Sequence, residues 1–126
     1  MTAPQTTDVI TDTVRRYLDA VATGTAAQIA GLYAPDATVE DPVGSAPHRG
    51  TEAVTAFYAA LENLRRSTEL LALRVAGNEA AFHFRVRTEI DGNAHVIEPI
   101  DVMTFDDEGR ITSMRAFWSA ADMRQA

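Results

Sequence analysis

The hydrophobic pattern of this chain changes its period once, near Ser67, and this change limits the folds that are open to it. After this point apolar residues alternate with polar ones, as expected of strands with one buried face. Four such segments are predicted: Glu69–Val75, Ala80–Ile90, His95–Phe105 and Arg110–Ser119. They are separated by the turn signals Gly77-Asn78, Asp91-Gly92-Asn93 and Asp106-Asp107-Glu108-Gly109. Short turns between successive strands predict hairpins, and hence an antiparallel sheet.

Before Ser67 the apolar residues recur at helical spacing. A first helix carries Ile10, Val14, Tyr17, Leu18 and Val21 on one face, and Gly24 ends it. A second helix begins at the capping box Thr25-x-x-Gln28, has Ile29, Leu32 and Tyr33 on one face, and ends before Pro35. Residues 38–42 are predicted to be extended, because Pro42 disfavours helix at Asp41. A third helix begins near Thr51 and presents Val54, Phe57, Tyr58 and Leu61.

Helices followed by hairpin-linked strands predict an α+β domain in which helices cover one face of an antiparallel sheet. The length of 126 residues fits a single domain that spans residues 1–126. A strongly twisted sheet curls, and three helices that close a curled sheet leave a conical pocket with a mouth.

Composition narrows the function. The net charge of −7 argues against nucleic acid and against an anionic membrane as partners. The absence of cysteine excludes disulfides, thiolate metal sites and a cysteine nucleophile. No apolar run is long enough to span a bilayer, and the first residues lack the features of a signal peptide, so a cytoplasmic location is expected. His48, His83 and His95 do not have metal-ligand spacing, and no metal site is predicted.

One acidic residue, Asp101, lies inside the apolar segment Val96–Phe105. A buried carboxyl either finds a cation or stays protonated, because burial raises its pKa. A protonated carboxyl in an apolar pocket can donate to developing negative charge. The alternation of this segment is ambiguous, so both a pocket position and a solvent-facing position for Asp101 remain open.

Neighbouring strands choose their faces more clearly. Phe82, Phe84 and Val86 alternate with His83, Arg85 and Arg87, while Met114, Ala116 and Trp118 alternate with Ser113, Arg115, Phe117 and Ser119. If Asp101 shares the face of Phe84 and Met114, the sheet offers an apolar cavity that contains one carboxyl.

Several short motifs together resemble a known family. They are Tyr17, Thr38-Val39-Glu40-Asp41-Pro42, Phe57-Tyr58, Ile100-Asp101-Val102-Met103 and Phe117-Trp118-Ser119. In this order and spacing they resemble ketosteroid isomerase, and the resemblance runs from about Val14 to Trp118. The wider superfamily has the cone-shaped fold of nuclear transport factor 2.

The resemblance implies roles for individual residues. Asp41 matches the catalytic base, and Tyr17 and Asp101 match the two oxyanion-hole donors. In that family the oxyanion-hole aspartic acid is known to be held neutral by its apolar site. The supporting hydrogen-bond network is expected from Tyr33, Tyr58 and Trp118, with the Trp118 indole bonded to the base. The substrate-binding wall is expected from Val21, Phe57, Leu61, Phe82, Phe84, Val86, Met103, Met114 and Ala116.

The activity implied by the resemblance is isomerisation of 3-oxo-Δ5-steroids to the conjugated Δ4 products through a dienolate, without a cofactor. The family is also dimeric, and the apolar residues Ile100, Val102 and Phe117 on the outward sheet face suggest a homodimer interface. The residues alone leave other functions open. Asp41 before a proline can be a turn residue, Tyr17 can be an ordinary core tyrosine, and the same fold serves hydrolases, dehydratases and non-catalytic binders.

Overall fold

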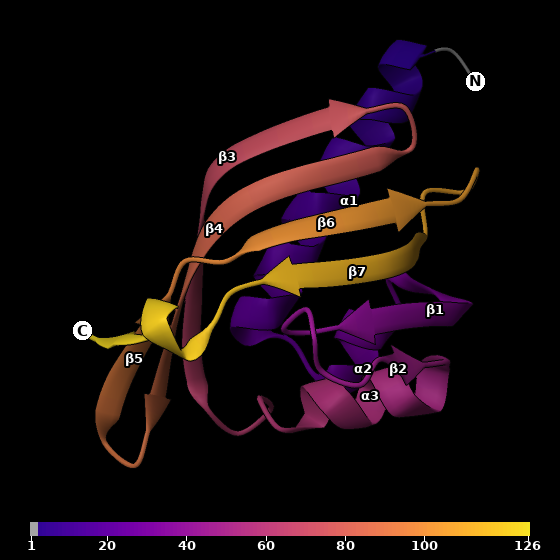
Figure 1. Cartoon of the computed structure of the whole chain (residues 1–126). Helices are drawn as coiled ribbons and strands as arrows, with labels where there is room; N and C mark the ends of the chain where they lie inside the picture. The colour runs from indigo at the N-terminus through magenta and orange to yellow at the C-terminus, as the bar shows by residue number, and fades with distance from the viewer. Residues whose placement is uncertain (1–2) are drawn as a thin grey trace.

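The chain folds into a curved sheet with one long helix across its inner face (Figure 1). The computed structural model describes the backbone of residues 3–126 and the side chains from residue 6 onward. The helices are α1 (Ala3–Thr23), α2 (Ala26–Ala30) and α3 (Thr51–Ala59). The strands are β1 (Tyr33–Glu40), β2 (His48–Arg49), β3 (Arg65–Ala76), β4 (Glu79–Ile90), β5 (Asn93–Ile97), β6 (Ile100–Phe105), β7 (Ile111–Phe117) and β8 (Arg124–Gln125). The α+β class and the three helices agree with the sequence prediction.

The sheet is mixed, which corrects one part of the prediction. Its strand order is β2-β1-β7-β6-β4-β5-β8, and β3 pairs with the other edge of β4. The hairpin strands pair in antiparallel fashion as predicted, but β1 runs parallel to β7, with Val39 opposite Met114. A parallel pair needs a long crossover and leaves no turn signal between its strands, so local patterns do not reveal it.

The long strand β4 changes partner along its length. Its first half pairs with β6 and its second half with β5, so the sheet bends between them. The predicted single strand His95–Phe105 is therefore wrong as one piece, because it is interrupted at Glu98 and Pro99. Proline has no N–H for the ladder. The Pro99 carbonyl still accepts a bond from Phe84 N at 3.3 Å.

The second helix is shorter than predicted. The capping box is confirmed, since Gln28 N donates to Thr25 Oγ1 at 3.1 Å and Thr25 N donates to Gln28 Oε1 at 2.9 Å. The helix ends at Ala30, and Tyr33 begins β1 instead of continuing a helical face. Pairing with β7 replaces further helix at this point, and it begins where the Leu32 carbonyl accepts a hydrogen bond from Ile111 N at 3.0 Å.

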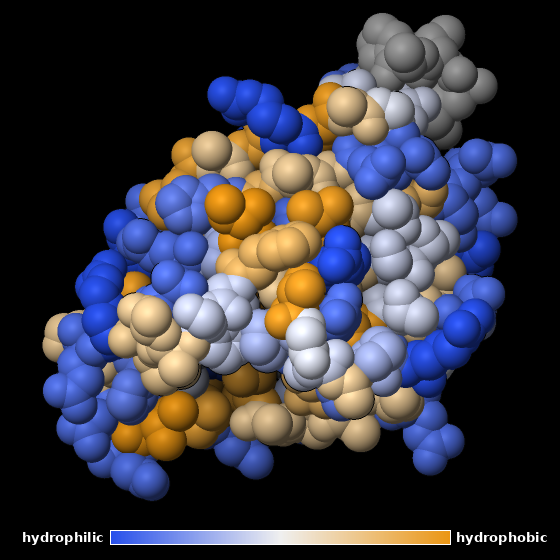
Figure 2. Space-filling view, viewed as in Figure 1, coloured by the Kyte–Doolittle hydropathy of each residue, from blue (hydrophilic) through white to orange (hydrophobic). Residues whose placement is uncertain are grey.

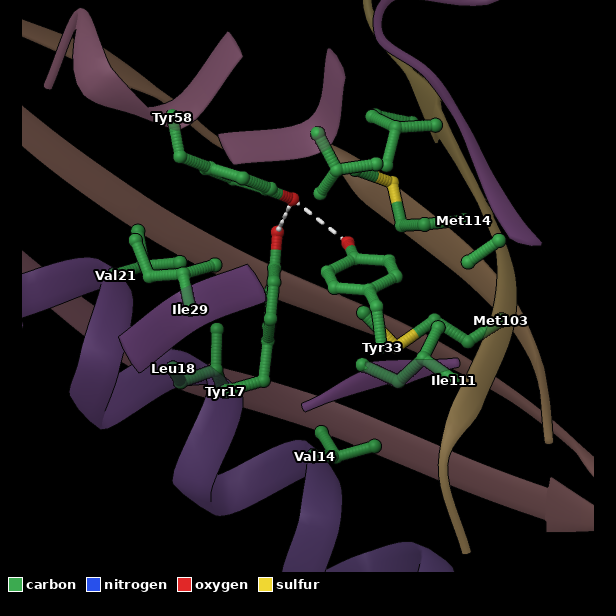
Figure 3. Packing of buried hydrophobic residues seen from close by; sticks show 14 of the residues in the cluster. Val14, Tyr17, Leu18, Val21, Ile29, Tyr33, Tyr58, Met103, Ile111 and Met114 are labelled. Atoms are coloured by element: carbon green, nitrogen blue, oxygen red, sulfur yellow. Dashed lines mark hydrogen bonds between the residues drawn. The ribbon is translucent and has the colours of Figure 1, made fainter. Parts of the chain in front are cut away.

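The core lies between α1 and the inner face of the sheet. Figure 3 shows Val14, Tyr17 and Leu18 of α1 on one side of the packed layer and Tyr33, Met103 and Ile111 of the strands on the other. The predicted α1 face is confirmed in full, because Ile10, Val14, Tyr17, Leu18 and Val21 are all buried. In α3, Val54 and Tyr58 are buried and Phe57 is half-buried, whereas Leu61 lies just beyond the helix.

Two short strands and a helical turn were not predicted from the sequence. They are β2, the 3-10 turn Ala120–Asp122 and β8, which pairs with β5 at the edge of the sheet. Within residues 3–126, no helix is long and apolar enough to cross a membrane.

Candidate active site

A cavity of about 270 Å³ opens between α1, α3 and the bent sheet. It is lined by Tyr17, Val21, Asp41, Phe57, Tyr58, Ala60, Leu61, Phe84, Val86, Thr88, Ile97, Pro99, Asp101, Ala116 and Trp118. Most of these side chains are apolar, and the polar groups come from six different elements or their ends. An apolar cavity with a few convergent polar groups is the usual form of a small-molecule site.

Strand register decides the position of Asp101 that the sequence left open. Asp101 lies opposite Phe82 on β4 and Ala116 on β7, so it shares the inner face of the sheet. Asp101 is only 1% exposed, and within the part of the chain that the structure describes neither of its carboxyl oxygens has a hydrogen-bond partner. Burial, and then the charge of Asp41, raise the pKa of Asp101 well above its ordinary value.

Asp41 follows the end of β1, where a cis peptide bond joins it to Pro42. The indole Nε1 of Trp118 donates to Asp41 Oδ1 at 2.6 Å, which leaves the other carboxyl oxygen for a ligand. Burial raises the pKa of Asp41, while the Trp118 hydrogen bond and the nearby His48 oppose that rise. The two aspartates therefore differ in surroundings, since Asp41 has a hydrogen-bond donor and Asp101 has none.

Three tyrosine hydroxyls meet beside these carboxyls. Tyr58 Oη lies 3.0 Å from Tyr17 Oη and 2.7 Å from Tyr33 Oη, and the dashed lines in Figure 3 mark both contacts. The three residues come from α3, α1 and β1, and all three side chains are buried. Burial is the main reason that the pKa of each phenol is raised well above its ordinary value. All three groups therefore remain protonated hydrogen-bond donors at neutral pH.

The cavity wall matches the sequence-derived set in part. Val21, Phe57, Leu61, Phe84, Val86 and Ala116 line the cavity, whereas Phe82, Met103 and Met114 pack in the core cluster away from its surface. Ala60, Thr88, Ile97 and Pro99 line it without having been singled out. Three of these continue known faces, because Thr88 has the parity of Phe84, and Ile97 and Pro99 have the parity of Asp101. Extending the alternation of Phe84 and Val86 along β4 would have found Thr88, whereas Ile97 and Pro99 depend on the face of Asp101, which the sequence left open.

The cations of β4 lie outside the cavity. Arg85 pairs with Glu98 at 2.7 Å and with Glu69 at 2.8 Å, and no arginine is among the cavity-lining residues. Among residues 3–126, no group of three or more histidine and acidic side chains is arranged to hold a metal ion.

The chain is similar to known proteins over most of its length. Residues 14–114 match the model of the SnoaL-like domain. A steroid Δ-isomerase of Nocardioides simplex is 60% identical over 110 residues, which are 87% of this chain and 89% of that protein. The chain belongs to the steroid Δ-isomerase family of SnoaL-like proteins. The family resemblance predicted from the motifs is thereby confirmed.

Solved structures place this steroid Δ-isomerase family member among similar folds. SalBIII, described as an epoxide hydrolase/cyclase-like enzyme in pyran ring formation in salinomycin, superposes with a TM-score of 0.83 at 25% identity, covering 93% of this chain and 95% of its own. RV0760c of Mycobacterium tuberculosis gives a TM-score of 0.84 at 21% identity, covering 94% and 96%. These likenesses confirm the cone-shaped fold.

Proposed function

We propose that this protein moves the double bond of 3-oxo-Δ5-steroids into conjugation by transferring a proton through a dienolate. The observation that carries this proposal is the pairing of two unlike carboxyls in one apolar cavity, with a tyrosine hydroxyl network beside them. The 60% identity to the Nocardioides simplex steroid Δ-isomerase supports the same substrate class.

Asp41 acts as the base in this proposal. The Trp118 indole fixes one carboxyl oxygen, and the other is free to take the proton from C4 and return it to C6. The same group must accept and then release the proton, so its pKa must lie close enough to the working range for both steps. Burial raises the pKa of Asp41, and the Trp118 bond limits the rise, which suits this dual task.

Tyr17 and Asp101 stabilise the dienolate oxygen at C3. Both line the cavity, and Asp101 has a carboxyl with no other partner in the part of the chain that the structure describes. A neutral carboxyl can donate its proton to an oxyanion, and a donor positioned in advance costs no reorganisation during the reaction. The raised pKa of Asp101 keeps that proton in place.

The tyrosine network then has one possible direction. When the single proton of Tyr17 is donated to the substrate oxygen, the 3.0 Å bond between Tyr17 and Tyr58 must be donated by Tyr58. The proton of Tyr58 is then in use, so Tyr33 donates across the 2.7 Å contact. Chains of this kind polarise one another, and Tyr33 and Tyr58 therefore strengthen Tyr17 as a donor without touching the substrate.

The experiment is isomerisation of 5-androstene-3,17-dione, followed by the ultraviolet absorbance of the conjugated product. Asp41→Asn keeps the shape and removes the base, and we expect a loss of about 10²- to 10⁴-fold in kcat. Asp36→Asn is the matched control, because Asp36 is an exposed aspartate of β1, the strand that Asp41 directly follows. Full activity of Asp41→Asn would eliminate the proposed base.

A hydrolase of the Asp-Arg-Asp kind is less well supported. That chemistry needs an arginine between two carboxylates, and the arginine nearest in sequence to Phe84 is engaged by Glu98 and Glu69 outside the cavity. A non-catalytic binding protein does not require a carboxylate such as Asp41 held in place by the Trp118 indole. Failure of the wild-type protein to isomerise any 3-oxo-Δ5-steroid while it binds a steroid phenol would favour the binder.

We also propose that the protein works as a homodimer in the cytoplasm. The outward sheet face carries Ile100 at 47% exposure and Phe117 at 42%, and Figure 2 shows apolar side chains grouped over the middle of this face. Apolar groups of this kind mark association surfaces. Sedimentation of the wild-type protein as a monomer would overturn the dimer, and an Ile100→Arg variant is expected to dissociate it.

A further inference from the structure

His48 lies on the cavity side of the sheet, near the candidate base. It belongs to β2 and pairs with Val39 of β1. Opposed residues of an antiparallel pair face the same side of the sheet, and Val39 is fully buried, so the His48 side chain faces inward. Asp41 follows Val39 by two residues, which places it on the same side. Neither the sequence prediction nor the proposed reaction uses this histidine.

The imidazole of His48 packs on Phe57 of α3. The two ring centroids are 4.8 Å apart, at an interplanar angle of 37°. Phe57 also meets Tyr58 edge to face, with centroids 4.9 Å apart. Aromatic pairs at such distances attract one another beyond the area that they bury. Phe57 lines the cavity and His48 does not, so His48 supports a wall residue without reaching a ligand.

His48 also brings a positive charge toward Asp41, because an imidazole becomes charged as pH falls. The cavity wall contains no arginine, lysine or histidine. Among the residues that the structure describes, Asp41 forms no ion pair, and its hydrogen bond comes from the neutral indole of Trp118. Burial raises the pKa of Asp41, and the Trp118 bond and the charge of His48 oppose this rise.

The other ionisable groups around β2 are engaged elsewhere or exposed. The elements packed against β2 are β1 and α3, which flank it in Figure 1. Together with β2 itself they carry Asp36, Glu40, Arg49, Glu52 and Tyr58. Glu40 pairs with Arg115 at 3.1 Å, and Tyr58 belongs to the tyrosine network. Asp36 and Glu52 are exposed, and Arg49 is exposed on the other face of the sheet, opposite Thr38.

We propose that His48 is a positioning residue of the active site, whose ring holds Phe57 in the cavity wall and whose charge favours the ionised form of the base. This inference rests on the proposed function, because it gives His48 a part in preparing Asp41 for the reaction. His48 touches neither the substrate nor the reacting atoms, and it acts only through these two neighbours. The ring and the charge can therefore be removed one at a time.

Three substitutions separate the two contributions. His48→Phe keeps an aromatic ring and removes the charge, His48→Lys keeps a charge and removes the ring, and His48→Ser removes both. Arg49→Met is the matched control, because it removes a cation of the same strand that faces away from the cavity.

The charge is tested without any substrate. Trp118 is the single tryptophan of the chain and its indole N–H donates to Asp41, so the one indole signal in a proton–nitrogen correlation spectrum reports the ionisation of that carboxyl. We expect the midpoint of its pH titration to move to higher pH in His48→Phe and His48→Ser, because the carboxylate loses a positive neighbour. His48→Lys and Arg49→Met should keep the wild-type midpoint. A midpoint that does not move in His48→Ser would overturn the charge contribution.

The ring is tested by the kinetics of 5-androstene-3,17-dione isomerisation at a pH above the acid limb. His48→Ser and His48→Lys should raise KM about twofold to tenfold, the equivalent of one lost aromatic pair, with little change in kcat. This pattern is expected when binding is lost equally from the ground and transition states. His48→Phe should restore the wild-type KM. Equal KM values in His48→Phe and His48→Ser would show that the ring contact does not position Phe57.

Failure of this inference is distinguishable from failure of the proposed function. If the wild-type protein isomerises no steroid, the indole titration still tests the charge, and the Kd of the phenol estrone replaces KM as the test of the ring. If the steroid is isomerised but the His48 variants match the wild-type protein in both measurements, the reaction stands and the positioning role is refuted.

Discussion

Asp101 should make the stability of the fold depend on pH in a way that Asp101→Asn removes. Burial raises the pKa of Asp101 in the folded chain, whereas the unfolded chain has the ordinary value of about 3.9. Between these two pKa values the folded chain binds more protons than the unfolded chain. The contribution of this group to the free energy of unfolding is therefore full below about pH 3.9, and it is lost as pH rises toward the folded-state pKa.

The magnitude follows from the proton count. One proton held only by the folded chain changes the free energy of unfolding by about 1.4 kcal/mol per pH unit. If Asp101 keeps its proton through pH 7, as proposed, its contribution falls by about 2.7 kcal/mol between pH 5 and pH 7. At 1% exposure, solvent does not screen this effect. Asparagine has nearly the same shape and no proton to lose, so the variant lacks the decrease.

The assay is urea denaturation of both proteins at pH 5, 6 and 7, followed by far-ultraviolet circular dichroism. From pH 5 to pH 7 the free energy of unfolding of Asp101→Asn should rise by about 2.7 kcal/mol relative to that of the wild-type protein. Asp36→Asn, at an exposed position of β1, controls for the loss of an aspartate elsewhere. A difference that stays constant from pH 5 to pH 7 would show that Asp101 ionises inside the fold, and the neutral donor would be refuted.

Two further predictions concern the other site residues. Tyr17→Phe removes one oxyanion donor and should lower kcat on the order of 10²- to 10³-fold. Tyr33→Phe should lower kcat far less, because Tyr33 acts only through Tyr58, and steady-state kinetics of the two variants measures the difference. Activity should fall as pH drops through the raised pKa of Asp41, and Trp118→Phe removes a donor that lowers this pKa. The acid limb of kcat/KM should therefore move to higher pH in Trp118→Phe, and a shift to lower pH would contradict the assignment.

Local patterns predicted the elements better than their pairing. The capping box at Thr25 and the buried face of α1 depend on neighbours in sequence, and both are confirmed. Tyr33 was assigned to a helix because its spacing from Ile29 is helical, but it belongs to β1. Its strand is fixed by β7, far along the chain, and such long-range pairing overrides local periodicity.

The candidate site also combines features that the sequence predicted with features that depend on long-range pairing. The motifs selected Tyr17, Asp41 and Asp101, and the cavity contains all three, although their catalytic roles remain predictions. The face of Asp101 was not readable, because apolar residues stand on both sides of its segment, Pro99 and Met103 on one and Ile100 and Val102 on the other.

The interruption at Glu98 and Pro99 has a consequence for how this protein can diversify. It divides the sheet side of the cavity wall into two structural units, since Asp101 lies on β6, which pairs with the first half of β4, while Ile97 and Thr88 lie on β5 and the second half of β4. Substitutions in the β4–β5 hairpin can therefore reshape this part of the wall without moving Asp101. New substrates would be recruited by altering the hairpin, while the reaction chemistry is inherited unchanged.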